Sequence, residues 1–199
     1  MTSKGSKAYR SVEDNMLVSA DDPTIKVRVA DGFSFVGELE FILYDVAYVN
    51  LFVLVREEPT RPAQIVMQFE HYLEDNDHTY SYESPGRITL GEHEYIYDVQ
   101  AVNVPAAVAQ RPDSDAAQVM RLVSEKGYPM PEEAIFARFV RMLDDTNRRE
   151  LLIIYSEPLS QPGLTAADLQ PGGRAEQHFT ELSQGLITRA LQSFEIIEG

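Results

Sequence analysis

The segment from Glu70 to His78 gathers several side chains whose types and spacing could bind a metal ion. Zinc and similar divalent ions are held by imidazole and carboxylate groups, usually three or four of them, at roughly 2–2.3 Å. The two histidines of the segment would approach each other across a tight polar turn that also carries carboxylates. The sequence therefore predicts a divalent metal site whose candidate ligands are His71, Glu74, Asp77 and His78.

The same residues also fit a turn without a ligand. Their spacing matches no named metal motif, and no motif in the chain requires a cofactor. Asp and Asn side chains in turns bond readily to nearby backbone N–H groups, and His71 beside Phe69 is then a hydrogen-bonded structural residue. Because most buried polar groups are simply satisfied ones, this interpretation is favoured over the metal site.

A second candidate site consists of polar side chains within apolar strands. Glu70 and Tyr72 share one face of a strand, and Arg138 lies among apolar residues of a later strand. A charge in such surroundings must be paired, hydrogen-bonded or at the mouth of a cavity. At a cavity, Arg138 would bind a carboxylate or phosphate group bidentately. The sequence therefore predicts either a ligand pocket lined by Arg138, Glu70 and Tyr72 or a buried ion pair between Glu70 and Arg138. Structural pairing, or solvent exposure at a sheet edge, is favoured over the pocket.

Signatures of common enzymes are missing from the chain. It has no Gly-rich phosphate loop, no dinucleotide fingerprint, no His-Glu-x-x-His and no Gly-x-Ser-x-Gly. No residue is assigned as catalytic, because 32 Asp+Glu make any choice of a carboxylate pair arbitrary. The sequence favours a non-enzymatic domain that binds a small ligand or a protein partner. A metal-dependent hydrolase at residues 70–78 and a homo-oligomer that pairs through a sheet edge are the alternatives.

The charge of the chain limits its partners. Its 199 residues include 17 Lys+Arg and 32 Asp+Glu, for a net charge of −15. Nucleic acids and anionic membranes attract clusters of basic groups, so neither is an expected partner. No apolar stretch is long enough to cross a bilayer, and membrane insertion is not expected. The protein is expected to be soluble.

The absence of cysteine excludes disulfides and thiolate chemistry. It also fits a bacterial cytoplasm. No signal-peptide pattern follows Met1, which predicts a cytoplasmic protein, with export left open if the sequence has been trimmed.

The elements that must position these residues change character along the chain. Residues 1–22 are polar and predict a flexible N-terminal arm. Residues 24–104 alternate with the period of strands, including short ones at 79–82 and 87–90. After Pro105 the pattern predicts a helix that a Ser or Asp caps and that Gly127 ends, followed by a hairpin, a last helix and a final strand.

This order of elements predicts the fold class. A run of strands followed by helices is typical of α+β proteins. We expect one domain over residues 23–199, in which a curved, largely antiparallel sheet carries two main helices. The alternative is a half-open β-barrel whose second face holds a cavity.

Parts of the sequence resemble known proteins. Three segments are similar to a family of uncharacterised bacterial proteins: residues 69–80, 111–128 and 149–155. The likeness runs over most of residues 30–195 and implies no activity and no catalytic residue. The Asp-Gly-Phe start of a strand at residue 31, the curved sheet and the closing helix are more loosely similar to the PsbP-like fold. That resemblance implies a layout and not a function.

Overall fold

The computed structural model describes residues 9–60, 62–83, 86–159 and 161–197, which form two antiparallel sheets and a few helices. The first sheet has the strand order β1-β2-β3-β11 and the second the order β4-β5-β6-β10-β9-β8-β7. The strands are β1 (Arg10–Glu13), β2 (Met16–Ser19), β3 (Ile25–Val29), β4 (Ser34–Leu43), β5 (Ala47–Arg56), β6 (Ala63–Tyr72), β7 (Gly86–Leu90), β8 (His93–Asn103), β9 (Glu133–Met142), β10 (Arg149–Pro158) and β11 (Phe194–Ile197). The helices are α1 (Val104–Gln110), α2 (Asp115–Glu125), α3 (Ala166–Leu169), the 3-10 turn η1 (Glu176–His178) and α4 (Phe179–Ser193). The prediction of a single α+β domain with a largely antiparallel sheet is confirmed.

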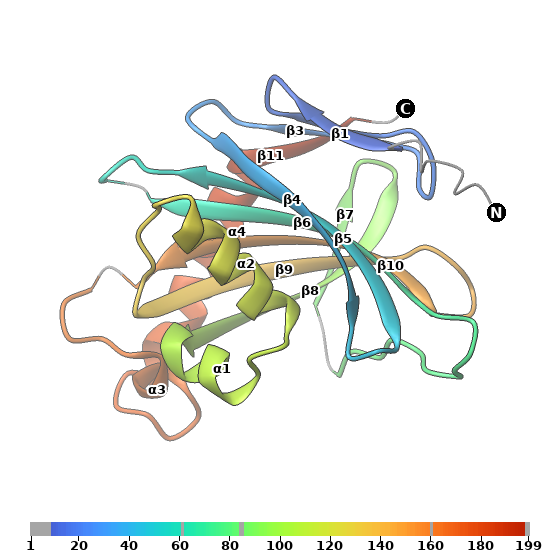
Figure 1. Ribbon diagram of the computed structural model, residues 1–199. Helices are drawn as coiled ribbons and strands as arrows, with labels where there is room; N and C mark the ends of the chain where they lie inside the picture. The colour runs from blue at the N-terminus through green and yellow to red at the C-terminus, as the bar shows by residue number, and fades with distance from the viewer. Residues whose placement is uncertain (1–8, 61, 84–85, 160, 198–199) are drawn as a thin grey trace.

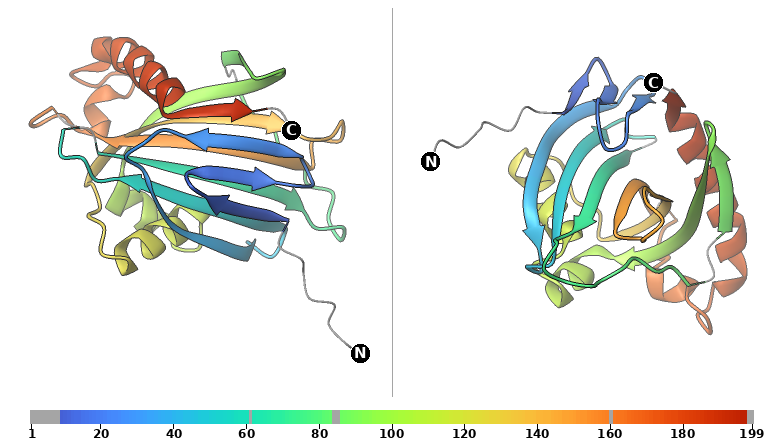
Figure 2. Two further views of the ribbon diagram at one scale, coloured as in Figure 1. Left: turned by 90° about the horizontal axis from the view of Figure 1, so that it is seen from above. Right: turned by 90° about the vertical axis from the view of Figure 1, so that its right-hand side faces the viewer.

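The second sheet is strongly curved and encloses most of the core (Figure 1). Seen from the end, the first sheet lies across its open side (Figure 2), and α4 packs against β9. Within the described residues, no strand pairing joins the edge strands of the first sheet, β1 and β11, to those of the second, β4 and β7, and β4 does not pair with β7. The arrangement is therefore a sheet that curves without closing, as in the half-open alternative.

The two faces of the second sheet pack against different partners because neighbouring residues of a strand point to opposite faces. On the inner face, side chains such as Met67 and Phe139 pack against the first sheet and α4. On the outer face, Val66 and its neighbours pack against Val119 and Val123 of α2. Most residues of β5 and β6 are thus buried on both faces, which explains the nearly continuous apolar sequence of β5.

Local sequence signals fix the helix that covers the outer face. The Ser114 side chain accepts a hydrogen bond from the backbone N–H of Ala117 and so caps the first turn of α2. Gly127 follows the helix with a φ of +84°, a conformation that glycine adopts without steric cost. The cap and stop predicted from the sequence stand where expected.

The structure differs from the sequence-based expectations in three places. Where a flexible arm was expected over residues 1–22, residues 10–13 and 16–19 form strands that pair with each other and with β3; residues 1–8 of the predicted arm lie outside the described residues. The segment 79–82 is not a strand, and a short helix, α1, follows β8. The strands at residues 10–19 form by pairing with nearby segments, β1 with β2 and β2 with β3, whereas the Tyr80 and Tyr82 side chains of the loop bond to Glu70 and Glu150. Across the described ranges, no helix is both long and apolar enough to cross a membrane.

Candidate functional site

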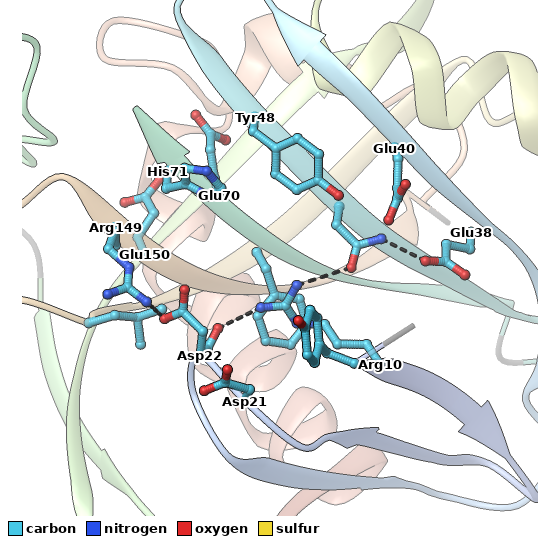
Figure 3. A pocket seen from close by; sticks show the side chains of 14 residues that line it. Arg10, Asp21, Asp22, Glu38, Glu40, Tyr48, Glu70, His71, Arg149 and Glu150 are labelled. Atoms are coloured by element: carbon cyan, nitrogen blue, oxygen red, sulfur yellow. Dashed lines mark hydrogen bonds and ion pairs between the residues drawn. The ribbon is translucent and has the colours of Figure 1, made fainter. Parts of the chain in front are cut away.

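A cavity of about 270 Å³ lies between the two sheets, and its lining includes residues of one edge strand from each sheet, β1 and β4 (Figure 3). Asn50 of β5 and Phe69 of β6 form its buried floor, with 2% and 3% of their surface exposed. Glu38 and Glu40 of β4 are exposed and form part of its rim. The inner face of the sheet thus continues from the apolar core into a polar site.

A guanidinium group links the two sheets at this floor. Arg10 of β1 donates hydrogen bonds from Nη1 to Asn50 Oδ1 at 3.3 Å and from Nε to Ser19 Oγ at 3.2 Å. Its Cζ atom also lies 3.9 Å from the centre of the Phe69 ring, a cation–π contact. Burial lowers the pKa of Arg10 from its usual value, yet arginine stays charged at neutral pH. Arg10 is therefore already bonded to the protein.

The rim of the cavity is acidic. Asn50 Nδ2 donates to Glu38 Oε1 at 2.7 Å, which holds this carboxylate at the mouth. Arg149 forms an ion pair with Asp22 and is neutralised by it. The lining carboxylates on this face are Asp21, Asp22, Glu38 and Glu40, against the guanidinium groups of Arg10 and Arg149. Within the described residues no ion pair engages Asp21, Glu38 or Glu40, so the site has an excess of negative charge.

Two aromatic side chains complete the walls. Tyr48 of β5 and His71 of β6 lie with their ring centres 5.1 Å apart. Burial and a hydrogen bond to Glu40 raise the pKa of Tyr48 to about 12, and its hydroxyl points toward Glu40 (Figure 3). Burial and the nearby charge of Arg10 lower the pKa of His71, so its imidazole is neutral at pH 7. Neither ring adds a positive charge to the cavity.

Glu70 and Glu150 also border this region, but their side chains lie on the outer face of the sheet. Glu70 lies between Phe69 and His71 of the cavity lining, and Glu150 follows Arg149. The two glutamates are directly opposite each other in β6 and β10. Glu70 accepts hydrogen bonds from Gln68 Nε2 at 2.7 Å and Tyr80 Oη at 3.0 Å. Glu150 accepts one from Tyr82 Oη at 2.8 Å. Burial raises the pKa of both carboxyl groups, that of Glu150 to about 8, and the charge of Glu70 contributes to the shift of Glu150.

Glu70, Tyr72 and Arg138, which the sequence predicted to line a pocket, all lie on the outer face of the sheet. Each of them already contacts other side chains of the protein. Tyr72 stacks on Tyr80 with a centroid distance of 4.4 Å. Arg138 binds both carboxylate oxygens of Asp98, at 3.1 and 2.6 Å, and its Cζ lies 4.9 Å from the Tyr82 ring centre. Arg138 thus forms an ion pair with Asp98 and not the buried pair with Glu70 that the sequence suggested, and both side chains of the pair are partly exposed. Tyr80 and Tyr82 occupy the space beside the two buried carboxylates.

The predicted metal ligands do not gather at one point. His71 packs against Tyr48 on the inner face, whereas His78 lies near Tyr72, which is on the outer face, at 5.5 Å between ring centres. Glu74 and Asp77 are exposed residues of the loop that follows β6. In the part of the chain that is described, no group of three or more His, Asp or Glu side chains is placed to hold a metal ion.

Replacing Tyr82 by phenylalanine tests the anchoring of this loop. The variant Tyr82→Phe removes the hydroxyl bonded to Glu150 and is expected to lower the free energy of unfolding by about 1 kcal/mol at pH 6. Urea denaturation measures this change. Tyr44→Phe, at an exposed tyrosine, is the control and should leave stability unchanged. Equal stability of Tyr82→Phe and wild type would show that the bond contributes nothing.

Sequence reasoning did not identify Arg10, Asn50, Glu38 and Glu40 as site residues. One signal was present: Asn50 interrupts an otherwise apolar strand, and a buried amide requires partners. The two glutamates alternate with apolar residues, a pattern that is also typical of a strand with one solvated face. Only the position of the first sheet shows that this face borders a cavity.

Comparison of the chain with protein-family models, with curated proteins and with solved structures gives no significant match. The resemblances suggested by the sequence therefore stay predictions. What the protein does must be inferred from its own side chains.

Proposed function

We propose that this protein is a binding domain for a small organic cation, such as a primary amine, which occupies the cavity between β1 and β4. The proposal rests on the excess of carboxylates at the cavity mouth. Asp21, Glu38 and Glu40 lie at the rim, whereas both guanidinium groups are already engaged. An ammonium group at the mouth would form charge-assisted hydrogen bonds with these carboxylates.

The walls also favour a cation over an anion. The ring of Tyr48 offers its face to a positive group, and His71 is neutral. An anionic ligand would have to displace Arg10 from Asn50 and Arg149 from Asp22 while approaching an acidic rim. The volume of about 270 Å³ suits a ligand smaller than a typical drug molecule.

Amine binding is tested by thermal stability in the presence of ligands. A panel of putrescine, cadaverine and tyramine is measured beside a panel of dicarboxylates of similar size. An amine at a hundred times its Kd would stabilise the native state by about 2.7 kcal/mol, which is a measurable increase in Tm. We expect a rise with at least one amine and none with the dicarboxylates.

The double variant Glu38→Gln/Glu40→Gln tests the location of the site. It keeps the size of both side chains and removes two charged acceptors, so we expect at least a tenfold weaker Kd by calorimetry. The matched control is Glu74→Gln/Asp77→Asn, which changes the net charge equally on an exposed loop outside the cavity. Equal weakening in both double variants would indicate nonspecific attraction to an acidic chain and overturn the proposal.

The same assay tests the metal site predicted at residues 70–78. Zinc and calcium are added with and without a chelator. Stabilisation by a metal that is lost in His71→Ala and in His78→Ala would support that alternative and not the amine site.

A further inference from the structure

The cavity opens beside a strand whose outer edge is free. Within the described residues β4 (Ser34–Leu43) pairs with β5 and with no other strand, so it is a terminal strand of its sheet. A free edge presents backbone N–H and C=O groups that another extended chain can bind. Phe35 and Ile42 on this strand are 43% and 46% exposed. β4 therefore has the length and backbone that the addition of a strand requires.

Acidic and apolar side chains alternate along β4. Glu38 and Glu40 face the cavity, whereas Leu39 and Phe41 are partly buried against the apolar cluster under α2. A strand laid beside β4 would place its own alternate side chains next to these two rows. Residues two apart in that strand are separated by roughly 6.6–6.8 Å, the same spacing as the two glutamates. The fitting sequence alternates basic and apolar residues.

We propose that an extended peptide adds to the free edge of β4 and inserts a Lys or Arg side chain into the cavity between β1 and β4. The inference rests on the proposed function and names its ligand class: the organic cation is the side chain of a peptide. The flexible alkyl stem and the charged end of lysine match a cavity with an aromatic wall and an acidic mouth.

A second copy of this chain fits the edge less well. In an antiparallel pairing of two β4 strands centred on Leu39, each Glu38 would lie opposite Glu40 of the other chain. Like charges directly opposite each other destabilise a sheet. The net charge of −15 adds repulsion between two copies. Both repulsions oppose the pairing of two copies and favour a basic peptide as the occupant of this edge.

The test uses a fluorescent heptapeptide that alternates Lys and Val, with both ends blocked, in an anisotropy titration at fixed ionic strength. We expect it to bind at least tenfold more tightly than acetyl-lysine amide and to lose at least tenfold in affinity to Glu38→Gln/Glu40→Gln. Glu74→Gln/Asp77→Asn is again the matched control, and its affinity should stay within twofold of wild type.

Backbone pairing is tested separately with two N-methylated peptides. Each is methylated at alternate residues, one in each frame, so that one edge of the peptide loses its N–H donors. Because only one edge can face β4, we expect one peptide to lose at least tenfold in affinity and the other to bind as the parent does. Equal binding of the two methylated peptides would overturn strand addition.

The outcomes separate this inference from the proposed function. If simple amines bind and the heptapeptide binds no more tightly than acetyl-lysine amide, the cavity site stands and the peptide inference is overturned. If neither amines nor peptides bind, both proposals fail. If the chain self-associates with increasing concentration and the peptide competes with that association, the edge belongs to a second copy, which also overturns the inference.

Discussion

Glu150→Gln is expected to abolish most of the loss of stability that the wild-type protein shows as the pH rises from 5 to 9. Burial raises the pKa of Glu150 to about 8, above its reference value of 4.5. The native state therefore holds a proton that the unfolded chain releases between these two values. The stabilisation is fully present below pH 4.5 and is lost as the pH rises through about 8.

The surroundings of Glu150 explain the size of this effect. Its carboxyl group is 2% exposed and lies opposite Glu70, whose charge opposes its ionisation. The charge of Arg138 and the hydroxyl of Tyr82 favour ionisation but do not offset the burial. Since each pKa unit corresponds to about 1.4 kcal/mol, the loss for wild type is on the order of 4 kcal/mol.

Urea denaturation at several pH values measures the effect. Glutamine keeps the shape and an oxygen acceptor for Tyr82, so Glu150→Gln should fold normally and exceed wild type in stability above pH 8. Glu74→Gln carries the same change of charge at an exposed site and should follow the wild-type curve. Parallel pH profiles of wild type and Glu150→Gln would contradict the prediction.

Arg10→Met is expected to lower the free energy of unfolding by about 2–4 kcal/mol. The substitution leaves the Oδ1 atom of buried Asn50 without its guanidinium donor, which costs about 1–3 kcal/mol. It also removes the cation–π contact with Phe69, worth about 1 kcal/mol or more when desolvated. Methionine still fills the space over the ring, so the loss reports on the guanidinium group.

Chemical denaturation of three proteins distinguishes this from a general effect of removing arginine. Arg28→Met, in strand β3 of the same sheet, removes an exposed ion pair with Glu195 and should cost less than about 1 kcal/mol. Arg10→Lys retains the charge without the planar group and should lie between the two. A loss in Arg10→Met no larger than in Arg28→Met would show that Arg10 does not join the two sheets.

The sequence allowed the elements to be predicted where local signals decide them. The alternation of residues 134–143 and 150–156 predicted the hairpin of β9 and β10, and Ser114 predicted the start of α2. These features depend on residues close to one another in the chain. Local periodicity also predicted that both faces of β5 would be buried, because nine apolar or neutral residues follow one another there.

The site depended on register and on contacts between distant segments, which local signals do not carry. Arg138 was identified from its apolar neighbours, but its partner Asp98 follows only from the pairing of β8 with β9. The cavity requires that Arg10 reach Asn50, a contact across the two sheets. Residues 1–22 were predicted to be an arm because the two strands within them, β1 and β2, have only four residues each. Pairing of β1 with β2, and of β2 with β3, holds them in the sheet.

The tyrosines show a different limit of periodicity. Tyr80 and Tyr82 are spaced as in a strand, and the sequence predicted a strand there. In the structure this loop has no ladder, and the two side chains lie on the outer face because their hydroxyl groups bond to Glu70 and Glu150. A period of two identifies side chains that share a face, even where the backbone forms no strand ladder.

The pairing of β11 with β3 has a consequence for synthesis on the ribosome. The first sheet combines strands from residues 10–29 with a strand from residues 194–197. While the chain emerges, β3 can pair with β2 but its other edge stays open until almost all of the domain has left the exit tunnel. Such late, long-range pairing slows folding and exposes edges that aggregate. Nascent chains that stop before Phe194 should therefore depend on chaperones far more than the released domain does.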